Sequence, residues 1–478
     1  MPSADNASNA GFSGALKTMA LAAAMALGGM APQQAQAENM ADALVGAYNS
    51  SGLLEQNRAL LRAADEDVAL SLAALRPVIA WTTAVARNWT ETGVGGASTT
   101  RHASGFSSRL TFNLLIYDGG ASRLDTQAAK ETVLATRQTL VAFEQQILLR
   151  AVTAYMNVLL QGENVVLRQN NVRVLGEELR AAQDRFDVGE VTRTDVALAE
   201  SRLAGARSSL ASARGALVRA KAEYTNAVGH KPGVLAGQPR LPKRVASITT
   251  AEALAVNNHP SILSAQHLVS AAELTVQSTS KALGPSASIG ADIGVLDSIN
   301  NQNYTYDSGV SLSLTQPIYQ GGALAAALRR SMATRDSVRS NLLNVQRDVI
   351  QDVNDAFVRL EVAIASLVAT EERVRAAQVA FDGIREEATL GARTTLDVLT
   401  AEQELLNAQT SRISDLAERS IASYELLATQ GLLTAERLGL AVQIYDPTIY
   451  YNLVKTAPSQ ISKQSKELDR VLKALGKR

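Results

Sequence analysis

Cysteine is absent from the 478-residue sequence. Its absence excludes disulfide bonds, thiolate metal sites, thiol nucleophiles and an N-terminal cysteine that could carry a lipid. A charge excess is also absent, because lysine plus arginine and aspartate plus glutamate both total 46. Proteins that bind nucleic acids normally carry an excess of positive charge. We therefore expect no nucleic-acid partner.

Aromatic residues are scarce, at 4%, and alanine is abundant among the apolar residues. Large side chains fill compact cores, whereas small ones allow long helices to pack closely, so this composition favours long helices. The chain also lacks a phosphate-binding glycine-rich loop between a strand and a helix. Its histidines show no metal-ligand spacing; they are His102, His230, His259 and His267. We expect no catalytic site, cofactor or metal.

A long apolar run occurs only near the start of the chain. Residues 1–37 have the pattern of a secretory signal peptide: a polar region ending at Lys17, a short apolar run, and Ala35-Gln36-Ala37 as a cleavage sequence. Beyond it, no run of about 18 apolar residues follows, so we expect no transmembrane helix in the mature chain.

One stretch occurs twice, about 202 positions apart, and the predicted elements are arranged around its two copies. In each copy, an alternating segment leads into Tyr-x-Gly-Gly, at Tyr117–Gly120 and at Tyr319–Gly322. A long pattern typical of a helix follows each. The expected helices are 41–75, 121–187, 192–228, 250–283, 323–388 and 395–429.

The helix 192–228 carries apolar residues at alternating steps of three and four from Val196 to Tyr224. This 3.5-residue repeat predicts a coiled-coil seam, and alanine at every second seam position allows close packing. At about 1.5 Å per residue, the helix 121–187 extends for roughly 100 Å. We therefore expect an elongated molecule.

Four segments have the period-two alternation of strands, with one apolar face and one face of small or charged residues. Polar loops are expected at 95–105 and 297–304. Two soluble hairpins could produce this pattern, and so could the wall of a membrane barrel. The strands are expected at 78–94, 106–117, 287–295 and 309–315.

Four strands cannot close a barrel, and open strand edges are not tolerated in lipid. Three chains would supply twelve strands and, in the same way, a tube of twelve helical columns. The expected fold is mainly α with a β-barrel part: a trimeric twelve-stranded outer-membrane barrel continued by a coiled-coil periplasmic tunnel. A soluble periplasmic coiled-coil adaptor or scaffold is the alternative.

The region from about 41 to 455 resembles the TolC family of outer-membrane efflux and secretion channels. The resemblance rests on the repeated plan, on both Tyr-x-Gly-Gly junctions, on Asp446-Pro447, and on Gly391–Gln409, which is similar to the family's periplasmic tip. It implies a homotrimer in outer-membrane lipid that passively conducts substrates from an inner-membrane pump of the RND or ABC type, with a periplasmic adaptor protein. The duct would serve a tripartite efflux pump or type I secretion.

The two predicted helix turns align at the same offset, which pairs Gly189 with Gly391 and Asp195 with Asp397. A glycine there suits a left-handed helix cap, and an aspartate near a helix start suits capping. Three copies of Asp397 around a narrow mouth would also form an acidic ring.

The resemblance adds roles for these positions. Arg393 falls where the family has a gating arginine, and Thr194 and Asp195 fall where its partners lie, so an Arg393–Asp195 link is the expected lock. Gly189 and Gly391 are expected to contact the adaptor. Two positions depart from the family, since Thr400 replaces a second acidic residue and Ala388 a gating tyrosine.

The resulting division of the chain has four parts. After the signal peptide, each structural repeat is expected to contain a helix, a β-hairpin, a long helix, a tip turn and a return helix. The bounds are 1–37 for the signal peptide, 38–248 for the first repeat, 249–430 for the second repeat, and 431–478 for a C-terminal periplasmic segment.

Overall fold

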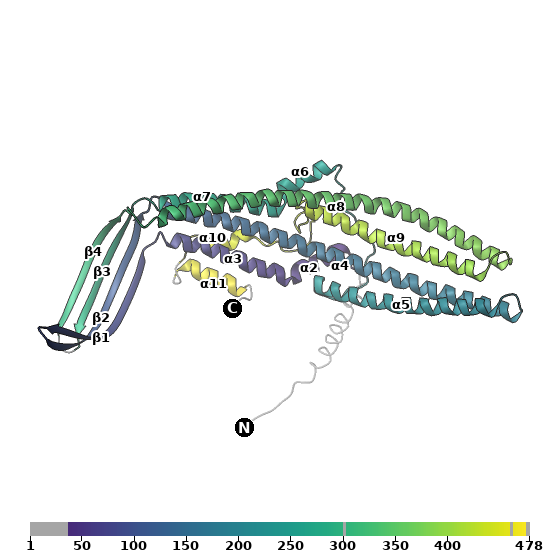
Figure 1. The fold of residues 1–478 in the computed structure, drawn as a ribbon, viewed down its shortest axis with the longest axis horizontal. Helices are drawn as coiled ribbons and strands as arrows, with labels where there is room; N and C mark the ends of the chain where they lie inside the picture. The colour runs from purple at the N-terminus through teal and green to yellow at the C-terminus, as the bar shows by residue number, and fades with distance from the viewer. Residues whose placement is uncertain (1–36, 300–302, 459–461, 475–478) are drawn as a thin grey trace, which may run out of the picture.

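The computed structural model describes residues 37–299, 303–458 and 462–474. Residues 1–36 of the expected signal peptide lie outside them. The molecule is elongated, with a four-stranded sheet at one end, a helical body, and two helical hairpins whose tips form the other end (Figure 1). This arrangement is mainly helical with a β part, as the sequence predicts.

The two halves of the chain repeat one order of elements. In the first half the elements are α2 (Met40–Ser50), α3 (Gly52–Ala73), β1 (Val78–Val94), β2 (Ala97–Tyr117), α4 (Ala121–Asp187) and α5 (Arg193–Val228). In the second half they are α6 (Ile248–Asn258), α7 (Pro260–Lys281), β3 (Ser286–Ser298), β4 (Asn303–Thr315), α8 (Ala323–Thr389) and α9 (Thr395–Thr429). The short helices α10 (Pro447–Val454) and α11 (Lys463–Ala474) follow.

Element lengths match between the halves. Helices α2 and α6 have 11 residues each, α3 and α7 have 22, and α4 and α8 have 67. The return helices α5 and α9 have 36 and 35 residues. The long helices therefore begin and end close to where the sequence predicts.

The predicted single helices 41–75 and 250–283 are each wrong, because each is two helices. Ser51 lies at the first break in extended conformation, and its hydroxyl accepts a hydrogen bond from the Leu54 amide at 3.2 Å. Ser51 thus caps the start of α3. His259 lies at the second break, and the following Pro260 disfavours a helical conformation at the residue before it.

The predicted loop 95–105 is also wrong. Only Gly95 and Gly96 form the turn, with φ of 62° and 86°, and β2 begins at Ala97. Two residues with positive φ form the tight hairpin turn that matches the twist of the strands. The hairpin β1–β2 is therefore longer than predicted. Part of the other predicted loop, residues 300–302, lies outside the described residues.

The sheet has the order β1-β2-β3-β4, with every neighbouring pair antiparallel. Its central pair joins the two halves, since β2 and β3 are separated in the chain by α4 to α7. The register pairs Leu110 with Ile293 there. Strands β1 and β4 are the two edges of the sheet.

Helix α4 is the central column of the helical body, where it packs against α3, α5, α7 and α9. The predicted seam of α5 faces it, and Ala199, Leu203 and Ala206 pack with Leu175 and Ala182 of α4. The larger apolar cluster lies further toward the sheet, where α2, α4, α5 and α9 meet residues 433–435. No described helix is both long and apolar enough to cross a membrane.

Candidate functional site: the hairpin tips and the sheet

Both helical hairpins turn by the same backbone geometry. After α4, the amide of Glu190 donates to the Arg185 carbonyl at 2.8 Å, and that of Gly189 donates to Phe186 at 3.0 Å. After α8, the amides of Ala392 and Gly391 bond to Glu387 and Ala388 at 2.9 and 3.2 Å. These pairs form Schellman motifs, which require a residue with positive φ.

Gly189 and Gly391 supply that conformation, with φ of 85° and 78°. Residues that carry a Cβ atom are strained in this left-handed conformation. The predicted helix-cap role of both glycines is therefore confirmed, and both residues lie exposed at the ends of the molecule. Their expected contact with an adaptor stays a prediction.

Each return helix begins with a reciprocal cap. The Asp195 carboxylate accepts from the Thr192 amide at 2.9 Å, and the Thr192 hydroxyl accepts from the Asp195 amide at 3.4 Å. Asp397 and Thr394 repeat the arrangement at 3.0 and 3.2 Å. The hydrogen bond from the threonine amide is the main reason why the pKa of each aspartate lies below its usual value. Capping by both aspartates is thus confirmed.

The predicted Arg393–Asp195 link is not formed within this chain. Arg393 instead pairs with Glu387, on the last turns of α8, across 2.8 Å. Asp195 is occupied by its own cap, and Thr194 lies exposed beside it. A link from Arg393 to a neighbouring chain stays a prediction.

The two positions that depart from the family have ordinary structural roles. Ala388 is buried, and it packs in a small apolar cluster with Phe381 and Val398. The Thr400 hydroxyl donates to the Leu396 carbonyl of its own helix at 2.8 Å.

The two hairpins are joined within the chain by polar contacts that the sequence analysis missed. Arg385 of α8 pairs with the buried Glu178 of α4 at 3.2 Å, and the Asn171 amide of α4 donates to the buried Glu402 of α9. Burial raises the pKa of Glu402 above its usual value.

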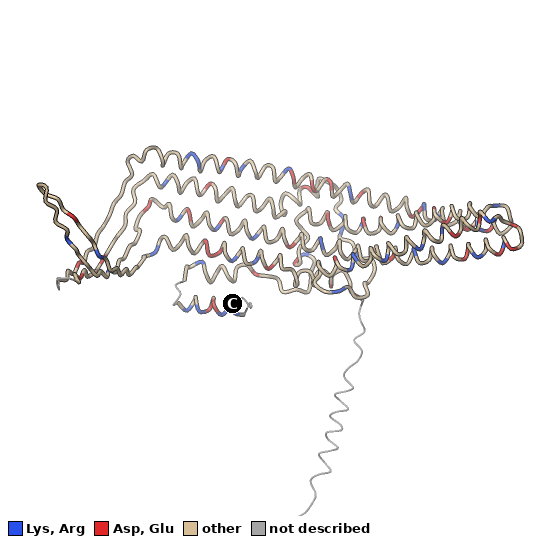
Figure 2. Tube along the Cα trace, turned by 60° about the horizontal axis from the view of Figure 1, so that its bottom comes forward, with Lys and Arg blue, Asp and Glu red and all other residues tan. Residues whose placement is uncertain are grey.

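A sequence signal for these contacts exists. Asn171 and Glu178 are separated by the same seven-residue spacing as apolar seam positions, so each is a polar residue in an otherwise apolar seam. Polar residues at such positions fix the register between helices. Figure 2 shows how the charged residues are distributed along the same helices.

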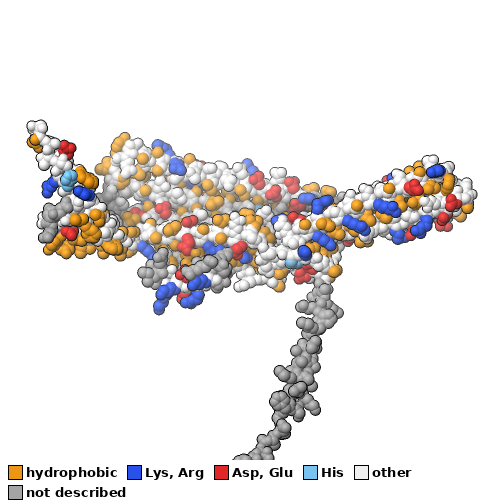
Figure 3. All heavy atoms as spheres, turned by 90° about the horizontal axis from the view of Figure 1, so that it is seen from below, with side chains coloured by type: hydrophobic (Ala, Val, Ile, Leu, Met, Phe, Trp, Pro, Cys, Tyr) orange, Lys and Arg blue, Asp and Glu red, His pale blue; other side chains and the backbone are white. Residues whose placement is uncertain are grey.

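At the other end, the sheet has one apolar face. Alternation and register place Ile79, Trp81, Leu110, Ile293 and Val310 on it. Trp81 is 75% exposed and Val310 is 83% exposed. Hydrophobic side chains gather over this end of the molecule (Figure 3). No described part of the chain covers them.

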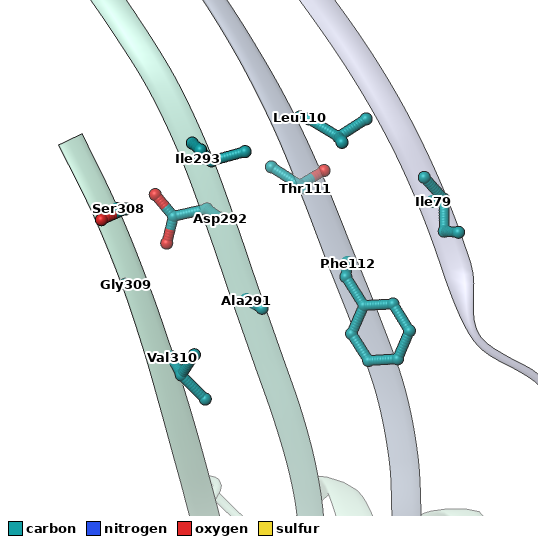
Figure 4. Close-up of a pocket in the computed structure, with 10 residues that line it drawn as sticks. All are labelled: Ile79, Leu110, Thr111, Phe112, Ala291, Asp292, Ile293, Ser308, Gly309 and Val310. Atoms are coloured by element: carbon teal, nitrogen blue, oxygen red, sulfur yellow. The ribbon is translucent and has the colours of Figure 1, made fainter. Parts of the chain in front are cut away.

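A shallow hollow of about 460 Å³ lies on the sheet. Figure 4 shows its lining residues on all four strands, among them Ile79, Phe112 and Val310. The opposite face carries small and charged side chains. On it, Arg109 of β2 bonds to Asp292 of β3 and, at 3.0 Å, to Asp307 of β4, so that one guanidinium links three strands.

The described residues contain no cluster of histidine, aspartate and glutamate that could hold a metal ion. The geometry consists instead of a strongly exposed apolar sheet face at one end and two capped, polar helix turns at the other. This arrangement fits a protein that acts through surfaces and assembly.

Comparison with known proteins agrees with this geometry. Residues 45–230 and 253–432 match the family model described as "Outer membrane efflux protein". The chain is 35% identical over 441 residues to the outer membrane efflux protein BepC of Brucella suis, which covers 91% of this chain and 95% of that protein. It is 26% identical over 374 residues to the alkaline protease secretion protein AprF of Pseudomonas aeruginosa, covering 75% and 76%.

The fold has solved counterparts. A crystal structure of the channel CusC superposes with a TM-score of 0.74 over 83% of this chain and 92% of that one, at 17% identity. The predicted resemblance to the TolC family is confirmed by sequence similarity to TolC itself. Because the family model covers most of the chain, this protein belongs to the outer membrane efflux protein family.

Proposed function

We propose that three copies of this chain form one continuous duct, with a twelve-stranded barrel in the outer membrane and a helical tunnel in the periplasm. As a family member, the protein is an outer-membrane export duct for efflux and type I secretion, with a periplasmic extension. It acts as a transport channel, not as an enzyme. The trimer, the barrel and the gate are the new elements of the proposal.

The observation that carries the proposal is the sheet. Each strand has at least 13 residues, more than the roughly 9–11 that a strand needs to cross a bilayer. One face is apolar and exposed, as lipid contact requires, and the other is polar. The edges β1 and β4 must be paired in lipid, so β4 of one chain would bond to β1 of the next.

Helix α8 supports the same assembly. Its exposed apolar residues lie within about a third of the helix circumference, at roughly 100° per residue. Such a stripe on a long helix fits burial against a neighbouring helix. The large residues in this stripe are Met332, Leu343, Val358, Val362, Val368 and Val379.

The tips form the proposed gate. Arg393 of one chain would reach Thr194 and Asp195 of its neighbour, and three copies of Asp397 would line the mouth as an acidic ring. Gly189 and Gly391 would contact the helical hairpins of a periplasmic adaptor, which would connect the duct to an inner-membrane pump of the RND or ABC type. The matched element lengths of the halves support an origin by internal duplication.

The proposed division of the chain keeps the predicted bounds. A signal peptide, 1–37, would direct export, the repeats 38–248 and 249–430 would each supply two strands, and the segment 431–478 would lie in the periplasm. The alternative, a soluble periplasmic coiled-coil adaptor or scaffold, leaves the apolar sheet face uncovered and is not favoured by the relatives.

The test is fractionation of the protein expressed in a Gram-negative host, followed by mass measurement in detergent. Extraction from outer membranes as a trimer would support the proposal. A monomer recovered from the soluble periplasmic fraction would contradict it. The control is a deletion variant that lacks both β-hairpins, β1–β2 and β3–β4, and keeps the helices. It should not enter the membrane fraction.

A further inference from the structure

Helix α11 carries four basic side chains on one exposed face. Lys463, Lys466, Arg470 and Lys473 follow one another at steps of three, four and three, which places them in one line along a helix. All four are exposed. We call this line the basic stripe. Leu468 and Val471, half-buried, lie on the opposite side of the helix.

The basic stripe has no anionic partner within the described part of the chain. None of its four cations forms an ion pair with the described residues. The helix carries two acidic residues, Glu467 and Asp469, which border the stripe on either side at steps of three and four from its cations but form no ion pair with them. Over residues 463–474, four basic and two acidic residues leave a net positive charge, and Figure 2 shows both kinds along α11.

Side-chain and backbone bonds hold the start of α11 beside the base of the sheet. The Thr456 hydroxyl donates to Gln464 in the first turn of α11 at 3.1 Å. Arg76 in turn donates to the Thr456 carbonyl and, at 2.5 Å, to that of Ala457. Only Pro77 separates Arg76 from β1, which begins at Val78. The start of α11 thus lies near the end of the helical body from which the sheet extends (Figure 1).

We propose that the basic stripe binds the phosphate groups of anionic phospholipids in the periplasmic leaflet of the outer membrane. The proposal rests on the proposed function, because α11 lies at a membrane surface only if the sheet spans that membrane. The stripe is about 15 Å long. A headgroup layer of about 5–7 Å and a screening length of about 8 Å bring most of it within the field of the lipid charges.

A lipid surface fits the position of the stripe better than a soluble acidic partner does. The tether through Arg76 fixes α11 to the strand junction, and a soluble partner would not require that position. Each basic residue close to an anionic leaflet strengthens binding by roughly fivefold. Four such residues would hold the C-terminal segment firmly against the membrane and would brace the junction of strand and helix.

Hydrogen exchange of the full-length trimer in nanodiscs tests the proposal. One nanodisc contains phosphatidylcholine alone, and the other also contains phosphatidylglycerol. We expect amides of residues 463–473 to exchange at least about tenfold more slowly with the anionic lipid, and high salt to remove the difference. In the variant K463Q/K466Q/R470Q/K473Q, these amides should exchange at the same rate in both nanodiscs.

The matched control is E467Q/D469N, which changes the same helix but removes its negative charges and should retain or enlarge the difference. Equal exchange in both nanodiscs, for a protein that is trimeric and inserted, would overturn the lipid proposal alone. Protection that appears only with purified adaptor would also overturn it and assign the stripe to a protein partner. Failure of the wild type to insert would instead overturn the proposed function.

Discussion

The Arg385 guanidinium of α8 lies 3.2 Å from the Glu178 carboxylate of α4. Glu178 is buried, while Arg385 is half-exposed. This pair joins the two helical hairpins of one chain near their tips. If the tips form the gate, the pair holds one hairpin against the other in the closed state.

Replacing Arg385 with glutamine should loosen the closed state. A buried carboxylate without its partner costs about 1–3 kcal/mol, so the open fraction should rise by roughly 5- to 150-fold. Single-channel recording in planar bilayers measures it. Glu177→Gln is the control, because Glu177 pairs with Arg173 on the exposed surface of its own helix. An unchanged open fraction in Arg385→Gln would exclude a gating role for the pair.

Removing the charge of Asp397 distinguishes a role in helix capping from a role in ion selectivity. Asparagine keeps a side-chain oxygen that can accept the capping hydrogen bond from the Thr394 amide, but it carries no negative charge. If three Asp397 carboxylates line the mouth, Asp397→Asn should lower the cation-over-anion permeability ratio several-fold. Reversal potentials under a salt gradient measure this ratio. Capping alone predicts an unchanged ratio, and Asp195→Asn provides the comparison at the equivalent position of the other hairpin.

Asp65 should make the helical body less stable as the pH rises through the weakly acidic range. Burial raises the pKa of this carboxyl to about 6, despite the nearby Arg137, with Glu66 raising it further. The folded state therefore favours the protonated form, and stability falls between about pH 4 and 6, by at most about 3 kcal/mol. Thermal unfolding of wild type and Asp65→Asn across pH 4–8 measures the difference.

Asp65→Asn should have a higher unfolding midpoint than the wild type at pH 7.5 and a similar one at pH 4. A variant that is less stable at pH 7.5 would mean that the ionised carboxylate is favourably paired in the folded protein. Asp67→Asn, on the same helix, is the control for a change of charge alone.

Glu38 should be the first residue of the mature protein. Its carboxylate accepts from the Tyr224 hydroxyl and, at 3.1 Å, from the Gly233 amide, and its backbone amide donates to the Val234 carbonyl at 2.8 Å. These bonds hold Glu38 firmly in place. Cleavage beyond Glu38 would remove these bonds, and Ala35-Gln36-Ala37 is the predicted cleavage sequence, so the intact mass should correspond to cleavage after Ala37. A start beyond Glu38 would contradict this prediction.

Removal of the Glu38 carboxylate gives a separate check. Glu38→Ala leaves the buried Tyr224 hydroxyl without its acceptor, which should cost about 1–3 kcal/mol of unfolding free energy. Chemical denaturation in detergent measures it. A variant as stable as the wild type would show that the bonds to Glu38 add nothing to the fold.

The long helices and their turns were predictable from sequence because their signals are local. Gly119-Gly120 and Gly189 mark the start and end of α4 through backbone conformations that glycine adopts easily. The breaks at Ser51 and His259 were missed because apolar periodicity continues across them, although Pro260 was a readable signal.

Other features depend on contacts that a pattern does not reveal. The hairpin β1–β2 was predicted too short because polar residues of 97–105 read as a loop, whereas a strand with a water-facing side accepts them. The Arg385–Glu178 contact joins residues far apart in sequence. A polar residue in an apolar seam indicates that a partner exists, but only the packed helices identify it.

Cross-linking of engineered cysteines tests most directly whether three chains close a barrel. Each variant carries one cysteine in β1 and one in β4 of the same chain. Because the chain has no cysteine of its own, every disulfide bond that forms joins introduced residues. In isolated outer membranes, we expect oxidation to join neighbouring chains into a covalent trimer, at pairs that recur with period two along the strands. An absence of links between chains along both strands, in a protein that reaches the outer membrane, would contradict the barrel.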